Sequence, residues 1–176
     1  MGFDWTGLLQ QALGGAAGPQ DAQEQFHQVT RSAPTELVSQ GLSAMFHSDQ
    51  TPEFGQLAGQ LFGQADPTQQ AGMLNQLIAG MAPGVLASLV SGASGAGLAS
   101  ILGQATQGGN AAITPDQAAQ MTPEQVQQIA SHAEQHHPGL IDRMSGFYAQ
   151  HPGLVKTLGG AALSIALAKM AERRAA

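Results

Sequence analysis

A run of 49 consecutive residues without a formal charge, from Pro67 to Pro115, constrains the fold of this chain more than any other feature. Charged residues make up only 10% of the whole chain, against about 25% in an ordinary globular domain. A helix on a protein surface normally presents charged or polar side chains to water. We therefore expect the uncharged run to be hidden from water, inside a core or against another molecule.

The centre of this run, MAPGVLASLVSGASGAGLASILG at 81–103, exceeds the length of about 20 apolar residues that crosses a bilayer. Pro83 and the glycine-rich SGASGAG stretch at 91–97 interrupt it, and both residue types disfavour a continuous helix. We predict two short buried helices joined by a glycine-rich hinge, packed closely because small side chains let backbones approach. A helical hairpin inserted into a membrane is the alternative.

Four predicted helix starts share one local pattern, in which a capping residue is followed by proline. The side chain of Thr or Asp accepts a hydrogen bond from a free backbone N–H, and proline fits the first turn, where its missing N–H costs nothing. Three of the four starts also carry Gln at the third helical position, which completes a capping box. The four capping residues are Thr51, Asp66, Thr114 and Thr122.

Apolar residues recur at helical spacing along most of the chain, and the alternation typical of β-strands is nearly absent. The sequence therefore predicts an all-α fold, a multi-helix bundle of short helices with a glycine-rich hinge and a C-terminal helical hairpin. Two regions are predicted, a Gly/Gln/Ala-rich helical region at 1–110 and a C-terminal helical region with a basic end at 111–176. The predicted helices lie at 4–13, 20–31, 34–47, 52–63, 67–81, 84–91, 96–104, 115–120, 123–136, 139–150 and 153–173.

Three short patterns occur twice in the chain. We favour repeated use of the same helix-start and packing chemistry as their origin, with a true duplication as the alternative. The pairs are LASLV at 86–90 with LASIL at 98–102, TPDQAAQ at 114–120 with TPEQVQQ at 122–128, and HPGL at 137–140 with HPGL at 151–154.

The formal charge is divided unevenly along the chain. Residues 1–142 hold eleven acids and one base, Arg31, for a net charge of −10, whereas residues 143–176 hold five bases and one acid, for a net charge of +4. A basic end of this kind favours an anionic membrane surface, or the acidic part of the same or a neighbouring chain. Five bases, most of them spread out, are too few for a nucleic-acid site, so no nucleic-acid partner is predicted.

The C-terminal segment TLGGAALSIALA at 157–168 is uncharged. As a helix it reaches about 18 Å, short of the roughly 30 Å hydrocarbon core of a membrane. We interpret it as a core helix or a self-association helix, with an interfacial membrane helix and then a membrane span as the alternatives. The residues predicted to make the contact are Leu154, Leu158, Leu163, Leu167, Lys169, Arg173 and Arg174.

The stretch SHAEQHH at 131–137 holds three of the six histidines of the chain. His132 and His136 are four residues apart and share one face of the predicted helix, a spacing that can hold zinc or another borderline metal. The alternative is that these histidines complement the negative end of a helix that Pro138 terminates. A metal would need a third ligand, and the candidates are His137, His151 and Asp142.

Motifs for other chemistries are not found. The chain has no cysteine, which excludes disulfides and thiol catalysis. The GASGAG stretch follows no predicted strand and is therefore not a phosphate-binding loop, and no convincing Ser/His/Asp set or paired carboxylates occur. We predict a non-enzymatic protein without a cofactor. Because the first residues lack the basic start and apolar run of a secretory signal, we expect a cytoplasmic location, with the surface of the inner membrane as the alternative.

The chain resembles small, uncharacterised bacterial proteins of the YidB-like kind. The resemblance rests on GLLQQALGGAAG at 7–18, the uncharged Gly/Leu/Gln middle, and ITPDQAAQMTPEQVQQIASHAEQH at 113–136. The end of the chain, HPGLVKTLGGAALSIALAKMAERR at 151–174, is similar to the C-terminal helices of other bacterial proteins. The resemblance implies a bacterial origin and brings no catalytic residues with it.

Taken together, these features predict a non-enzymatic interaction or scaffold protein. The predicted partner is a second copy of the chain, in a homo-oligomer, or another protein. Association with an anionic membrane surface through the C-terminal helix is a further prediction. The alternative function is that of a metal-binding protein that uses His132 and His136.

Overall fold

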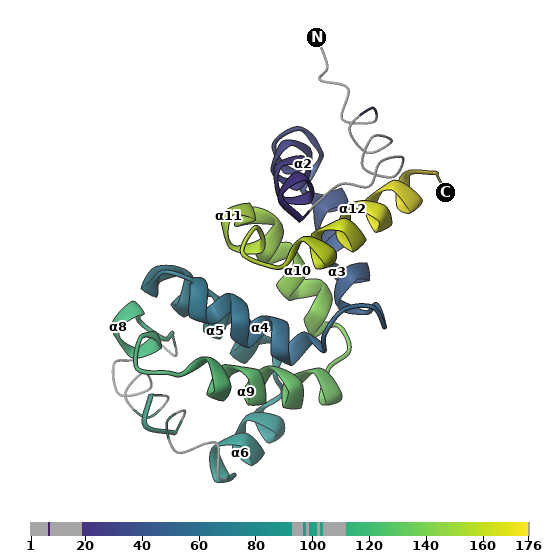
Figure 1. Ribbon diagram of the computed structural model, residues 1–176. Coiled ribbons are helices and arrows are strands. Elements are labelled where there is room, and N and C mark those ends of the chain that lie inside the picture. Colours follow the sequence, from purple (N-terminus) through teal and green to yellow (C-terminus); the bar gives the residue numbers. More distant parts are fainter. Residues whose placement is uncertain are drawn as a thin grey trace. The chain divides into compact units, whose positions relative to one another are not determined.

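A computed structural model describes residues 19–92 and 112–175, together with the separate positions 7, 97, 99–101 and 103. Every regular element among these residues is a helix, which confirms the predicted all-α fold (Figure 1). The described helices are α2 (Pro19–Ser32), α3 (Thr35–Phe46), α4 (Phe54–Gln64), α5 (Pro67–Gly80), α6 (Pro83–Ser91), α8 (Pro115–Ala118), α9 (Pro123–His136), α10 (Leu140–Gln150), α11 (Pro152–Val155) and α12 (Gly160–Ala175).

Most predicted helices are found with ends that differ by one or two residues from the expected ones. The predicted helix at 4–13 lies outside the described residues apart from Gly7, and so does most of the SGASGAG hinge. In the predicted helix at 96–104, the described positions 97, 99–101 and 103 are all helical.

Three predicted capping boxes are confirmed. The backbone N–H of Gln69 donates to the Asp66 carboxylate at 2.9 Å, and the Gln69 side chain accepts from the Asp66 N–H at 3.3 Å. Thr114 with Gln117 and Thr122 with Gln125 form the same reciprocal pair at the starts of α8 and α9. Each box satisfies backbone donors that a helix start otherwise leaves without partners.

The prediction that Thr51 caps a helix is wrong. Its hydroxyl donates to the backbone oxygens of Met45 and Ser48, at 2.6 and 2.9 Å, and so closes the turn that follows α3. Helix α4 begins at Phe54, and its N-cap residue, Glu53, makes no side-chain capping bond. Thr51 therefore stabilises the turn after α3 and does not cap the start of α4.

The predicted C-terminal helix at 153–173 is divided into two helices. The short α11 ends at Val155 and α12 begins at Gly160. Between them the Thr157 hydroxyl donates to the backbone oxygen of Leu154 at 2.6 Å, which closes a tight turn. The break coincides with Gly159 and Gly160, because adjacent glycines disfavour a continuous helix.

The helices form two compact units. The terminal unit combines Met1–Pro52 with Ser145–Ala176, and the central unit is Glu53–Met144. This division differs from the sequence-based boundary after residue 110. Composition and charge set that boundary, whereas the units are set by which helices pack together. The C-terminal helix α12 therefore folds with the N-terminal helices α2 and α3. The predicted partner of its basic residues stays a prediction.

The core of the terminal unit lies where α12 packs against α2 and α3. The helices approach closely at Gly41 of α3, where an added Cβ would lie 3.1 Å from the backbone oxygen of Ala166 and would overlap Met170. Glycine at this position lets the two helix backbones come close. The largest fully buried side chains of this core are Phe26, Leu42, Met45 and Tyr148.

The core of the central unit is dominated by the contact between α4 and α9. Gly55, Gly59 and Gly63 follow one another at intervals of four along α4, and each faces α9. Gly55 lies against Ser131, whereas Gly63 lies against Pro123, so the two helices run in opposite directions. Such close packing was expected from the sequence in the uncharged middle, and in the structure it is found at α4.

Helix α5 connects this core to the segment that leads into α8. The Asn75 side chain forms two hydrogen bonds with the backbone of Ile113: it donates to the Ile113 oxygen at 3.0 Å and accepts from the Ile113 N–H at 2.7 Å. Ile113 itself is buried. This pair replaces the backbone partners that the buried segment would otherwise lack.

Within the chain's own fold, the described part of the uncharged run is only partly buried, and its cover by another molecule stays a prediction. Helix α5 buries Ala71, Met73, Leu74 and Leu77 on one face, whereas α6 buries only Leu89. Many of the remaining positions are exposed or partly exposed. The run contains many Gln, Ser and Gly residues, which are hydrated without carrying a charge.

None of the described helices is by itself long and apolar enough to cross a membrane. Helices α5 and α6 meet the length and composition criteria only as a pair, and the chain bends by 117° between them.

The two HPGL segments form the same turn. The N–H of Leu140 donates to the His137 oxygen, and the N–H of Leu154 donates to the His151 oxygen, both at 3.0 Å. Both leucines are buried. Each segment joins two consecutive helices.

Candidate functional site

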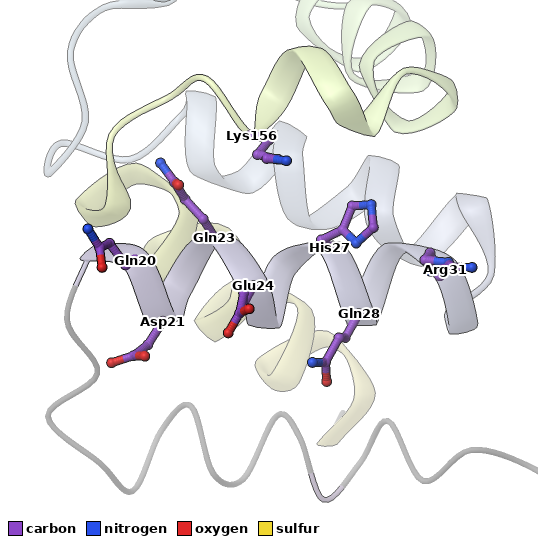
Figure 2. Close-up of a pocket in the computed structure, with 8 residues that line it drawn as sticks. All are labelled: Gln20, Asp21, Gln23, Glu24, His27, Gln28, Arg31 and Lys156. Carbon is purple, nitrogen blue, oxygen red and sulfur yellow. The ribbon is translucent and has the colours of Figure 1, made fainter.

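Helix α2 borders a polar hollow of about 630 Å³. Ala22, Phe26 and Val29 are buried on the inner face of α2, which leaves its polar residues on the outer faces. Figure 2 shows Gln23 and His27 extending to the side where Lys156 lies, and Asp21, Glu24 and Gln28 on the opposite side. The lining residues are Gln20, Asp21, Gln23, Glu24, His27, Gln28, Arg31 and Lys156.

A ligand in this hollow would make only contacts that water screens. All of its lining side chains except Gln23 are exposed, and all except Lys156 come from a single helix. Ion pairs between exposed groups contribute little because water screens them. Asp21 and Glu24 precede Arg31 along α2, an order that suits a polar, dipolar ligand, but no buried group fixes such a ligand in place. We therefore assign the hollow no ligand.

The predicted histidine pair does lie together on α9. The ring centroids of His132 and His136 are 4.7 Å apart, His136 is exposed and His132 is partly exposed. Within the described part of the chain, no group of three or more His, Cys, Asp or Glu residues is placed to hold a metal ion. The pair thus supplies two ligands, and the predicted metal site stays a prediction.

The candidate third ligands have other positions. The ring of His137 accepts a hydrogen bond from the backbone of Ala82. His151 belongs to the terminal unit, where it donates to the Phe147 oxygen at 2.9 Å and its ring lies against the Phe147 ring. Asp142 is exposed at the start of α10.

Two of the histidines hold helix α6 against α9. The N–H of Ala82, the N-cap residue of α6, donates to His137 Nε2 at 3.2 Å. At the other end of α6, Ser88 Oγ lies 3.3 Å from His132 Nε2. The Ser88 hydroxyl also donates its hydrogen to the Val85 oxygen at 2.8 Å, so His132 must be the donor in this second bond.

The corner between α5 and α6 is also held by the first HPGL turn. An added Cβ at Gly80 would meet Cδ1 of Leu140 at 2.6 Å, so the turn packs directly on the last residue of α5. These histidines stand out in the sequence for their chemistry. Their contact with α6 is not predicted, because nothing local in the sequence indicates which helix lies opposite α9.

Helix α6 keeps part of its apolar face in contact with water. Its large apolar residues are Val85, Leu86, Leu89 and Val90, which lie close together on the helix because neighbouring pairs among them are three or four residues apart. Only Leu89 is buried, at 7% exposure, and the other three are partly exposed. We call these four residues the α6 face. In LASIL at 98–102, the repeat of LASLV at 86–90, Ile101 occupies the position of Leu89 and is also buried.

The four leucines predicted to contact a partner are buried within the terminal unit. Leu154 lies in α11 and Leu158 follows it, and Leu163 and Leu167 lie on α12, which packs on α2 and α3. Their first role in this structure is to form the chain's own core. Their contact with a partner stays a prediction.

The predicted basic residues lie at the end of α12. Lys169 forms an ion pair with Glu172 at 3.0 Å, and Arg173 is exposed. Arg174 belongs to α12, and its side chain is outside the described part of the structure. An exposed ion pair between residues three apart on a helix contributes only a few tenths of a kcal/mol to the stability of the helix.

The side chain of Tyr148 is fully buried in the terminal unit, and its hydroxyl has no hydrogen-bond partner. It is the one such hydroxyl among the described residues. Its ring packs against Phe46 and Phe147, with centroids 5.8 Å away in both cases. Burial raises the pKa of the Tyr148 hydroxyl well above its ordinary value. The side chain therefore acts as a neutral, largely apolar part of the core.

No protein-family model matches this chain, and no curated protein or solved structure matches it significantly. The resemblance to YidB-like bacterial proteins therefore stays a prediction.

Proposed function

We propose that this protein is a non-enzymatic interaction protein that binds a second copy of itself through helix α6. The observation that supports this proposal is the α6 face. Three of its four large apolar side chains stay partly exposed in the chain's own fold. Covering apolar surface is favourable in proportion to the area removed from water, so this face gains free energy when another surface covers it.

The charges of the central unit favour α6 as the place where two copies meet. This unit carries six acids and one base, and none of them lies on α6. Two copies therefore repel each other over much of their surfaces. Approach through an uncharged helix avoids this repulsion, and it also avoids the cost of removing water from a charge.

The C-terminal helix is a weaker basis for association than its sequence indicates, because its leucines already form the core of the terminal unit. A neutral lipid surface is the other partner that an uncharged apolar helix suits. We argue for the second copy, and the experiment below includes the lipid surface as an outcome.

The test is the concentration dependence of molar mass, measured by size exclusion with light scattering. We expect the wild-type mass to approach that of a dimer as concentration rises. The Leu86→Glu variant should weaken the dimer about a hundredfold, because each copy loses roughly 1.5 kcal/mol of apolar burial, and 1.4 kcal/mol corresponds to a factor of ten. The matched control is Gln60→Glu, which adds the same charge at an exposed position of α4.

Equal loss of the dimer in Leu86→Glu and Gln60→Glu would mean that net charge, and not the α6 face, controls association. A monomer at every concentration would refute the proposal. A monomer that floats with neutral vesicles, and loses this property in Leu86→Glu, would assign the α6 face to a lipid surface instead. The full chain is used throughout, because removing residues 153–176 would remove core residues of the terminal unit.

A further inference from the structure

His132 and His136 are the one pair of histidines in the sequence that stand four residues apart. Both belong to α9 and share one face of this helix. His136 is the last residue of the helix and is exposed, and His132 is partly exposed. An ion in the surrounding water can therefore reach both rings.

The separation of the two rings matches the one that a shared metal ion requires. An imidazole nitrogen binds zinc at about 2.0–2.1 Å, which places the centroid of the ring about 3.2 Å from the metal. Two rings on one metal, at a ligand angle of about 90° to 109°, then have centroids about 4.5–5.2 Å apart. The observed separation is 4.7 Å, and the ring planes are tilted by 60° instead of being stacked. Chelation therefore requires no change in the backbone of α9.

Ser88 of α6 decides which nitrogen of His132 is available to a metal. Ser88 Oγ lies 3.3 Å from His132 Nε2 and donates its own hydrogen to the Val85 oxygen, so Nε2 carries a hydrogen. The lone pair of the neutral ring is then on Nδ1. Histidines that bind metals almost always donate their other N–H to an oxygen atom, which fixes the orientation of the ring. Ser88 supplies this oxygen to His132.

Three other histidines are held differently and serve as controls. In His47 and His151, Nδ1 lies 2.8 and 2.9 Å from the backbone oxygen four residues earlier. In His137, Nε2 accepts the hydrogen bond from the Ala82 N–H. None of the three has another histidine four residues away in the sequence, so none is expected to chelate an ion in this way.

The surroundings of the histidine pair favour a positive ion. The end of α9, where His136 lies, is the negative end of the helix dipole. Neither α9 nor α6 carries lysine or arginine, and the central unit as a whole carries six acids and one base. The field of such a unit raises the local concentration of cations.

We propose that Nδ1 of His132 and a ring nitrogen of His136 bind one divalent transition-metal ion, and that Ser88 is the positioning residue of His132. Imidazole ligands suit copper, nickel and zinc, whereas magnesium and calcium prefer oxygen ligands. Two protein ligands leave the other coordination positions to water. Cu²⁺ should bind more tightly than Ni²⁺ or Zn²⁺, which is the general order of affinity for such ions.

The test is calorimetric titration of the untagged full chain, first freed of metal with a chelator, at one fixed pH. We expect one Cu²⁺ or Zn²⁺ ion per chain and no binding of Mg²⁺. His132→Ala and His136→Ala should each lose this site, whereas His47→Ala should bind as the wild type does. Ser88→Ala should weaken binding about tenfold, the effect of losing the hydrogen-bond partner of a metal ligand, and Ser88→Thr, which keeps a hydroxyl, should retain the wild-type affinity.

Electron paramagnetic resonance of the Cu²⁺ form gives a second readout. The wild-type spectrum should show two nitrogen ligands, and the His136→Ala spectrum should not. Helical circular dichroism equal to that of the wild type excludes unfolding as the cause of a loss.

A wild type that stays free of metal throughout the titration would overturn the inference. Equal affinity in the wild type, His132→Ala and His136→Ala would also overturn it, because the ion would then bind elsewhere. One ion per two chains would contradict a site built within one chain. Unchanged affinity and an unchanged spectrum in Ser88→Ala would refute the role of Ser88.

Discussion

The contact between α4 and α9 leaves no room for a methyl group at Gly59. A Cβ added there would lie 2.7 Å from the backbone oxygen of Pro123 and 3.0 Å from the Cβ of Gln127, whereas ordinary van der Waals contact begins at 3.4 Å. The Pro123 oxygen cannot rotate away, because it belongs to the first turn of α9, whose start is fixed by the Thr122 capping box. The Gly59→Ala variant must therefore push the two helices apart.

The expected change in stability is the difference of two opposing effects. Forcing an extra carbon into a packed core costs about 1–3 kcal/mol. Alanine is favoured over glycine in a helix interior by about 1 kcal/mol. We therefore expect Gly59→Ala to lower the free energy of unfolding by about 1 kcal/mol. Gly84 of α6 has no atom within 4 Å of an added Cβ, so Gly84→Ala should raise stability by about 0.5–1 kcal/mol.

Urea unfolding followed by helical circular dichroism measures both variants, and hydrogen exchange in α4 and α9 assigns the change to the central unit. With a slope of about 2 kcal/mol per molar urea, the two midpoints should lie roughly 1 M apart. Gly63→Ala is an intermediate case, because its Cβ would meet only the ring of Pro123, with the nearest atom at 3.1 Å. A Gly59→Ala variant as stable as Gly84→Ala would show that α4 and α9 are not in such close contact.

Three further predictions concern other described residues. Burial raises the pKa of Tyr148, so above a pH of about 10 the unfolded chain loses a proton that the folded chain keeps. The free energy of unfolding should therefore fall with rising pH by up to about 1.4 kcal/mol per pH unit. In urea titrations, the Tyr148→Phe variant should lack this contribution to the fall. Asn75→Ala should cost about 1–3 kcal/mol, because it leaves the buried Ile113 backbone without partners, and hydrogen exchange at the Ile113 amide should show the loss. Elemental analysis tests the metal hypothesis: stoichiometric zinc, iron or copper that disappears in His132→Ala would establish a metal site, and a metal-free wild type would exclude it.

The candidate contact surface illustrates how far the sequence alone reaches. The uncharged run and the LASLV motif indicate a short apolar helix at the position of α6, and the structure contains it. The sequence also draws attention to His132 and to the HPGL turn. It does not reveal that His132 and His137 contact α6, since these contacts join residues 44 and 55 positions apart. For the same reason, it assigns the partner contact to leucines that the fold buries in its own core.

The sequence by itself determines where three of the described helices begin. The capping boxes at Asp66, Thr114 and Thr122 form between residues three apart, so they depend on nothing distant. Only the tertiary structure decides which helices share a core: α12 folds with α2 and α3, and α4 folds with α9. Such pairing depends on matching surfaces, such as Gly59 against Pro123, and these are brought together by the whole chain rather than by any local pattern.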